Sequence, residues 1–372
     1  MKKRRIGIDA RLLYQTGVGV YLRNLLLHLT KIKDDSVEIV VFAKQSEWNR
    51  FINEYSLHPT FYILQPCSVT WHSFSEQIVF LRQLYGAKLD IVHFPYFSWP
   101  VLYFGPFVST IHDTILLKHA TGRATTLPVV WYYIKSLVFR FVFWQQVMRS
   151  KTVFVPSNAV ASELEEYYPN IKGKIVVTHE GVDEVFAKSV SQKPQDMNLQ
   201  EKSYLLYVGN CYPHKNVEIL LKAISQSKEQ RVGSKGVLLV LVGPKSIFAD
   251  NLREKFKAIE DNILWLHDVK TTELKWLYVN AKALVFPSKA EGFGLPILEA
   301  LSVGCPLILS DIPVFHEVAG ENAIYFDSGK AEYLSTMLSN SLNNTTSLAG
   351  SSVADDFSFE KMAEITVSYY KK

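Results

Sequence analysis

The stretch LVFPSKAEGFGLPILEALSVGCPLI, residues 284–308, joins two short apolar runs through a segment rich in glycine and proline. The first run is typical of a buried β-strand, and the residues around Glu299 have the spacing of a helix. Glu291 therefore lies in a loop that follows a strand, and Glu299 lies eight positions later inside the helix. A strand, a helix and a second strand in this order form the unit of a parallel sheet.

The two glutamates are spaced for binding hydroxyl groups. One carboxylate stays in the loop at the sheet edge, while the other projects from the first turns of the helix, and ionised carboxylates accept hydrogen bonds from paired hydroxyls of sugars and ribose. The backbone N–H groups near Gly292 and Gly294 can bond to further oxygens. Two exposed glutamates without a function would not need so many glycines and prolines between them, so we interpret the segment as a binding site.

Outward from this segment, apolar runs alternate with amphipathic stretches along the whole chain, which predicts two doubly wound α/β domains facing across a cleft. The expected strands of the first half are 5–9, 37–43, 61–64, 90–94, 107–112, 152–156 and 174–178. Those of the second half are 204–209, 237–243, 262–266, 283–287, 306–310 and 323–326. Ligands of such sheets bind at the carboxyl ends of the strands.

The polar segment 188–202 divides the expected domains, which span residues 1–187 and 203–356. Its lack of apolar periodicity is typical of a linker. A second polar stretch precedes a last amphipathic helix, Phe359–Tyr370, within residues 357–372. That stretch is long enough for the helix to return to the N-terminal domain, and we expect it to pack there.

Charge and cysteine content exclude several classes of protein. The 372 residues carry 40 Lys and Arg against 36 Asp and Glu, a net charge of +4 that is too small for an electrostatic nucleic-acid binder. Cys67, Cys211 and Cys305 lie far apart, so we expect free thiols in a reducing compartment. The histidines lack zinc-site spacing, and no metal or cofactor site is predicted.

Three further places are candidates for binding phosphate or sugar, and each has an ordinary structural explanation as well. Gly17 and Gly19 follow the first strand, where they bring backbone N–H groups to a phosphate or make a tight turn. Lys215 stands at the start of a helix, where it binds a diphosphate or is solvated. His112 ends an apolar strand, where it bonds to a ligand hydroxyl or to its own loop.

Residues 127–149 combine aromatic and basic side chains. Seven aromatics lie in the 21 residues from 127 to 147, and Lys135 and Arg140 interrupt the run, so a membrane-spanning helix is not expected. One apolar stripe suits core packing, and its members are Val130, Ile134, Leu137, Phe141, Trp144 and Met148. Trp131, Phe139 and Phe143 fall off the stripe, which indicates either docking on an anionic membrane or burial against a neighbouring element or subunit.

The motif E-G-F-G-L-P-x-x-E-A at residues 291–300 resembles the E-x7-E signature of retaining nucleotide-sugar glycosyltransferases of family 4, also called glycosyltransferase group 1. The resemblance extends over nearly the whole chain. It includes IGIDARLLYQTGVGVYLRNLL, the strand ending in IHD, VFVPSNAVASELEEYY, VVTHEGVDEVF, YVGNCYPHKN and LVGP. It implies the GT-B fold of two Rossmann-like domains.

The resemblance also implies roles for individual residues. Glu291 and His112 would contact the transferred sugar, Glu299 the ribose, and Gly17 with Lys215 the diphosphate. The residues implied to bind the nucleotide sugar are Gly17, Gly19, Asn210, Lys215, Val269, Glu291, Gly292, Phe293, Gly294, Leu295 and Glu299. Asn210 and His214 stand where many relatives have arginine.

The activity implied by the resemblance is transfer of a hexosyl group, with mannosyl as the narrower expectation, from a GDP- or UDP-linked sugar to a glycan or lipid-linked acceptor. Retention by front-face attack without a metal, in the cytoplasm or on the inner face of the plasma membrane, belongs to the same expectation. A nucleotide-sugar epimerase, a glycan phosphorylase and a catalytically silent sugar-nucleotide-binding subunit remain alternatives. A dehydrogenase is disfavoured because Leu22 interrupts the dinucleotide fingerprint.

Overall fold

A computed structural model describes residues 3–32, 36–118, 129–194, 199–229, 238–341 and 356–372, and it divides into two compact units. Unit 1 comprises residues 1–120, 127–180 and 358–372, and unit 2 contains residues 181–357. The chain thus enters unit 2 after Glu180, so residues 181–187, assigned above to the first domain, belong to unit 2. Residues 195–198 of the expected linker and 342–355 of the second polar stretch lie outside the described residues.

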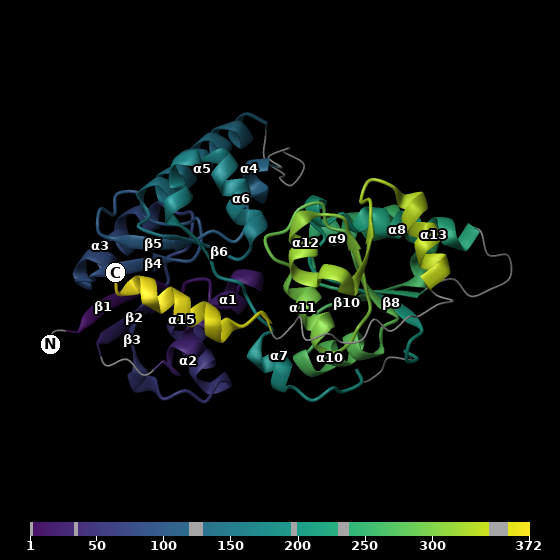
Figure 1. Cartoon of the computed structure of the whole chain (residues 1–372), viewed down its shortest axis with the longest axis horizontal. Coiled ribbons are helices and arrows are strands. Elements are labelled where there is room, and N and C mark those ends of the chain that lie inside the picture. Colours follow the sequence, from purple (N-terminus) through teal and green to yellow (C-terminus); the bar gives the residue numbers. More distant parts are fainter. Residues whose placement is uncertain (1–2, 33–35, 119–128, 195–198, 230–237, 342–355) are drawn as a thin grey trace. The chain divides into compact units, whose positions relative to one another are not determined.

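Unit 1 is built on a parallel sheet of seven strands in the order β3-β2-β1-β4-β5-β6-β7 (Figure 1). The strands are β1 Arg4–Asp9, β2 Val37–Ala43, β3 Tyr62–Pro66, β4 Ile91–Phe94, β5 Phe107–Thr110, β6 Val153–Val155 and β7 Ile175–Val177. The helices are α1 Thr16–Leu29, α2 Gln45–Glu54, α3 Leu81–Gly86, α4 Ile115–Lys118, α5 Val129–Arg149, α6 Asn158–Tyr167 and α15 Phe359–Tyr370, with a π-helical turn at Glu76–Phe80.

Unit 2 repeats this arrangement with six parallel strands in the order β10-β9-β8-β11-β12-β13. The strands are β8 Tyr204–Val208, β9 Leu238–Val242, β10 Ile263–Leu266, β11 Ala283–Phe286, β12 Leu307–Ser310 and β13 Ala323–Phe326. The helices are α7 Glu184–Lys188, α8 Val217–Glu229, α9 Ile247–Lys255, α10 Thr271–Asn280, α11 Leu295–Ser302, α12 Pro313–Ala319 and α13 Ala331–Ser341. The predicted fold class, two Rossmann-like parallel sheets, is confirmed.

The sheets form because their strands are almost wholly apolar. All four residues of β4, β5, β11 and β12 are buried, as expected for strands covered by helices on both faces. In each sheet the strand order reverses beside the first strand, between β1 and β4 in unit 1 and between β8 and β11 in unit 2. Loops that follow the two strands at such a point diverge and leave room for a ligand.

The C-terminal helix α15 belongs to unit 1 and packs beside α1 (Figure 1). Its Tyr370 hydroxyl lies 2.6 Å from Nδ1 of the buried His93 on β4, whose Nε2 lies 2.7 Å from Thr110 Oγ1 on β5. These contacts connect the end of the chain to the middle of the first sheet.

The long helix α5 packs with the face opposite to the one expected for the core. Phe143 and Val147 are buried in the core, and Phe139 is half-buried against it. The predicted core stripe is instead exposed at Ile134, Leu137, Phe141 and Trp144, and only Met148 of its described side chains packs inward. Assigning the stripe to the core was therefore wrong, and the side chains of Val130 and Trp131 lie outside those described.

Candidate active site

In unit 2, the structure brings two of the predicted site residues into direct contact. Lys215 ends a 3-10 turn, Pro213–Lys215, after β8, and Glu291 lies in the loop between β11 and α11. The Lys215 Nζ lies 2.7 Å from each carboxylate oxygen of Glu291, and the Ser288 hydroxyl donates to one of those oxygens at 2.7 Å. The two loops meet because β8 and β11 flank the point where the strand order reverses.

This pair is shielded from water but has unused bonding capacity. The side chain of Lys215 is 16% exposed and that of Glu291 is 8% exposed. An ammonium has three N–H donors, and two suffice for the carboxylate oxygens, so one remains for an incoming phosphate oxygen. A carboxylate accepts about four hydrogen bonds, so Glu291 retains room for a hydroxyl beyond Lys215 and Ser288.

Glu299, on α11, is the second glutamate of the motif. Its carboxylate accepts a hydrogen bond from the buried Tyr278 hydroxyl at 2.8 Å. Burial raises the pKa of the Glu299 carboxyl from 4.5 to about 7; the Tyr278 hydrogen bond opposes the rise, and Asp183 adds to it. A carboxyl with such a displaced pKa is a frequent feature of functional sites, and ribose hydroxyls are suitable donors to its ionised form.

The glycine-rich segment between the glutamates forms the N-terminus of α11. Gly292, Phe293 and Gly294 are buried, and Leu295 is the first helical residue. Gly294 adopts a φ of 101°, a left-handed conformation that explains why glycine occupies this position. The helix thus begins four residues after Glu291, which places its positive end close to the Lys215–Glu291 pair.

The remaining predicted residues of unit 2 lie at the same sheet edge. Asn210 follows β8, and its backbone carbonyl accepts a hydrogen bond from the Tyr207 hydroxyl at 2.6 Å. Val269 is half-buried in the loop after β10, where His267 Nδ1 lies 2.7 Å from the Gly243 carbonyl oxygen. These loops follow β8 and β10, which lie on either side of β9.

In unit 1, His112 follows β5, and both of its ring nitrogens have protein partners. The Nε2 atom lies 3.0 Å from the Pro95 carbonyl oxygen, and Nδ1 lies 3.3 Å from a carboxylate oxygen of the buried Glu180. Both partners are hydrogen-bond acceptors, a carbonyl oxygen on one side of the ring and a carboxylate on the other. Sequence reasoning did not identify Glu180, although it lies in the quoted segment VVTHEGVDEVF.

The two glycines of unit 1 differ in their surroundings. Helix α1 begins at Thr16, so Gly17 and Gly19 lie in its first turns and not in a loop before it. The Gly19 N–H donates to the Gln15 carbonyl, and a Cβ at Gly19 would lie 2.8 Å from the Leu13 carbonyl oxygen. A Cβ at Gly17 would meet nothing within 4 Å. Only Gly17 therefore leaves open space at the start of the helix.

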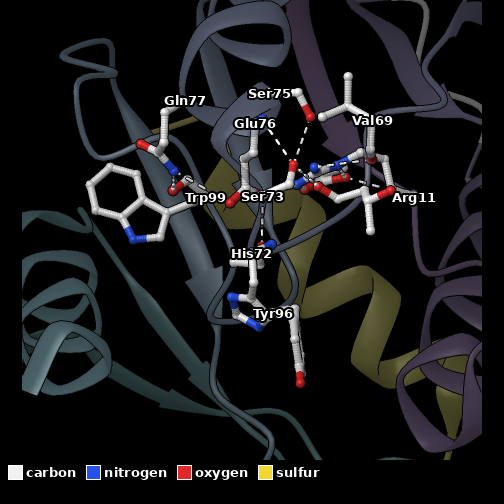
Figure 2. A network of polar contacts seen from close by, with 12 residues as sticks. Arg11, Val69, His72, Ser73, Ser75, Glu76, Gln77, Tyr96 and Trp99 are labelled. Atoms are coloured by element: carbon white, nitrogen blue, oxygen red, sulfur yellow. Dashed lines mark hydrogen bonds and ion pairs between the residues drawn. The ribbon is translucent and has the colours of Figure 1, made fainter. Parts of the chain in front are cut away.

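A buried ionic network at the carboxyl end of β1 was not predicted (Figure 2). The Arg11 guanidinium donates to both carboxylate oxygens of Asp9, at 2.8 and 2.7 Å, and to Glu76 at 2.7 Å. Ser98 also donates to Glu76, and the Arg11 guanidinium carbon lies 3.9 Å from the centre of the Phe80 ring. All of these polar side chains are nearly inaccessible to water.

The network contains one cation and two acids. Burial raises the pKa of the Glu76 carboxyl, whereas Arg11 and the Ser98 hydrogen bond lower it. The segment Asp9-Ala10-Arg11, an acid and a base two residues apart at a strand end, was an available signal. Glu76 carries no comparable signal because it lies 65 residues away in the sequence.

Among the described residues, no group of three or more His, Cys, Asp or Glu side chains has the geometry of a metal site. Within the same residues, no helix is both long enough and apolar enough to cross a bilayer.

Two family models match consecutive parts of this chain. The model described as Glycosyltransferase Family 4 matches residues 15–186, which lie almost entirely in unit 1. The model described as Glycosyl transferases group 1 matches residues 190–349 of unit 2, including the Lys215, Glu291 and Glu299 site.

Several curated relatives, among them the following two, are named as mannosyltransferases. The chain is 34% identical over 224 residues to the O-antigen chain mannosyltransferase RfbU of Salmonella typhimurium, covering 59% of this chain and 60% of the relative. It is 30% identical over 197 residues to the O-antigen chain mannosyltransferase B of Escherichia coli, covering 48% of each chain. The matched regions span less than two thirds of these relatives.

A solved structure covers the whole chain. The structure of Alr3699/HepE from Anabaena, in complex with UDP and glucose, has a TM-score of 0.74 and 13% sequence identity, covering 99% of each chain. At this identity the likeness shows the fold alone, the paired Rossmann-like domains of the GT-B class.

Proposed function

The chain belongs to the glycosyltransferases, in the families described as Glycosyl transferases group 1 and Glycosyltransferase Family 4, and from this premise we propose that it transfers a hexosyl group from a nucleoside diphosphate sugar to a glycan or lipid-linked acceptor. The names of the relatives RfbU and mannosyltransferase B favour a mannosyl group and a role in cell-surface polysaccharide synthesis. The UDP in the HepE structure supports a nucleotide donor.

The observation that carries the proposal is the Lys215–Glu291 pair, with Glu299 later in the same motif on α11. Cleavage of a sugar–phosphate bond leaves a diphosphate with growing negative charge, and Lys215 with the N-terminus of α11 supplies positive charge to stabilise it. Glu291 accepts a hydrogen bond from a hydroxyl of the sugar, and Glu299 accepts from the ribose.

We further propose that the anomeric configuration is retained. The resemblance of residues 291–300 to the E-x7-E signature supports retention, with the leaving phosphate accepting the proton of the acceptor hydroxyl. Product anomericity, read by nuclear magnetic resonance, tests this part separately from the transfer itself.

The site of action that we propose is the cytoplasmic face of a membrane, where a lipid-linked acceptor is accessible. The aromatic and basic composition of α5 supports this location.

Binding of the donor nucleotide is tested by a thermal-shift screen against UDP, GDP and ADP. A nucleotide that binds the folded state raises the melting temperature, and we expect one of the three to do so. The variant Lys215→Met should lose most of the shift, whereas Lys257→Met, at an exposed lysine of the same unit, should keep it. No shift with any nucleotide, or an undiminished shift in Lys215→Met, contradicts this assignment.

A further inference from the structure

Helix α5 carries a continuous apolar surface that faces solvent. Its members, here called the α5 stripe, are Ile134, Leu137, Val138, Phe141 and Trp144, with exposed fractions between 43% and 68%. Their spacing of three and four residues places them on one side of the helix over about 15 Å. The Phe141 and Trp144 rings lie 6.1 Å apart.

The stripe is not needed to hold the helix in place. The opposite side of α5 already supplies Phe143, Gln146 and Val147, which are all buried. Gln146 donates to the Tyr96 carbonyl, and the Val142 carbonyl accepts from the Trp99 indole. Since this inner face anchors α5 to unit 1, the exposed stripe is surplus to packing, and contiguous exposed apolar patches of this kind mark interaction sites.

Further exposed apolar residues lie at the C-terminal end of the same helix. Arg149 donates to the Val101 carbonyl at 2.8 Å, and its guanidinium lies 4.9 Å from the Phe104 ring. The Tyr85 hydroxyl accepts from the Phe104 backbone N–H. Phe104 is 74% exposed, and Leu102 and Tyr85 are also exposed, so a second group of exposed apolar side chains lies beside the C-terminal end of α5.

The charge around the stripe is positive. Lys135 and Arg140 are exposed and, at 100° per residue, fall on opposite flanks of the stripe. Helix α5 itself contains three Lys or Arg, namely Lys135, Arg140 and Arg149, and no acidic residue. The helix that carries the α5 stripe is therefore positively charged.

We propose that the α5 stripe docks on a lipid bilayer containing anionic lipids, with its aromatic rings at headgroup depth and Lys135 and Arg140 beside the lipid phosphates. A second copy of the chain is a poorer partner, because a symmetric contact would place the flanking cations of the two copies near each other. The proposal rests on the proposed function only in explaining why docking would be useful, namely access to a lipid-linked acceptor.

Sedimentation with vesicles tests the proposal. The full chain is mixed with vesicles of phosphatidylcholine containing about 30 mol% phosphatidylglycerol, or with phosphatidylcholine alone. We expect wild type to pellet with the anionic vesicles and the triple variant Leu137→Gln, Phe141→Gln, Trp144→Gln to bind at least about tenfold more weakly. The double variant Lys135→Gln, Arg140→Gln should bind more weakly only to the anionic vesicles.

Matched controls replace exposed residues of unit 2. A triple variant, Val190→Gln, Ile247→Gln, Tyr333→Gln, matches the α5 triple variant, and a double variant, Lys222→Gln, Lys257→Gln, matches the α5 double variant. Both should pellet like wild type. Equal pelleting of wild type and the α5 triple variant overturns the proposal. The proposal is also overturned if wild type does not bind vesicles and instead forms a dimer in sedimentation velocity that the triple variant does not form. The nucleotide-induced thermal shift, measured on the same variants, separates a failure of docking from a failure of the proposed function.

Discussion

Replacing Glu299 by Gln should stabilise unit 2 in a way that depends on pH. The raised pKa means that the native protein binds this proton more tightly than the unfolded chain does. Stability from this group is therefore complete below about pH 4.5, falls as the pH rises to about 7, and stays low above it. Gln is neutral at every pH, and its amide oxygen accepts the Tyr278 hydrogen bond in the same way.

The magnitude follows from the two pKa values. The pKa of Glu299 rises from 4.5 in the unfolded chain to about 7 in the native protein. Relative to low pH, ionisation of this group therefore lowers the free energy of unfolding by about 3 kcal/mol at pH 8 and by about 1 kcal/mol at pH 5. Glu299→Gln should therefore exceed wild type in the free energy of unfolding by about 2 kcal/mol more at pH 8 than at pH 5. Any effect of the amide that does not involve protons cancels in this comparison.

Urea unfolding at the two pH values, followed by circular dichroism, measures the difference. Glu254→Gln, at an exposed glutamate of α9, serves as a control in which the variant and wild type should differ equally at both pH values. If Glu299→Gln also shows a pH-independent difference, the Glu299 carboxyl does not have the displaced pKa, and the reasoning fails. The stabilised variant should bind the donor nucleotide less well, because it lacks the second carboxylate oxygen.

Three further outcomes are expected. Arg11→Met leaves Asp9 and Glu76 buried without a cation and should lower the free energy of unfolding by about 3–5 kcal/mol. Arg5→Met breaks a surface pair with Glu38 and should lower it by less than about 1 kcal/mol. Comparable losses for the two variants in urea titrations would contradict this. Transfer should persist in excess EDTA, because Lys215 and the N-terminus of α11 supply positive charge; complete loss restored by magnesium or manganese would refute it. Lys215→Met should weaken binding of a nucleoside diphosphate by roughly 10- to 100-fold in calorimetry, and an affinity unchanged from wild type would remove Lys215 from the diphosphate site.

The fold was predictable because parallel strands have a strong local signature. The expected strands 37–43 and 323–326 and the helix Phe359–Tyr370 have the observed bounds, and most other strands differ by one or two residues at an end. Gly17 and Gly19, expected in a turn after the first strand, lie inside α1, because packing of the following leucines against the sheet stabilises a helix that the glycines disfavour locally.

The candidate site was predictable only in part. Glu291 and Glu299 stood out because a sheet edge, glycines and paired acids coincide in one short segment. Tyr278 beside Glu299 and Glu180 beside His112 depend on tertiary contacts that periodicity does not encode. Ser288 lies only three residues before Glu291, but its hydrogen bond depends on the conformation of the loop. The exposed face of α5 was assigned to the core for a related reason, since both faces are apolar and the pattern alone does not distinguish them.

Transfer itself is the most direct test of the central claim. The protein is incubated with a nucleoside diphosphate hexose and a lipid-linked glycan acceptor, and mass spectrometry follows addition of one hexosyl residue. We predict addition by wild type and a loss of at least about 100-fold in Glu291→Gln, which should fold normally because Gln can still accept from Ser288. Nucleotide binding without transfer for any donor, or wild-type transfer by Glu291→Gln, would contradict the account.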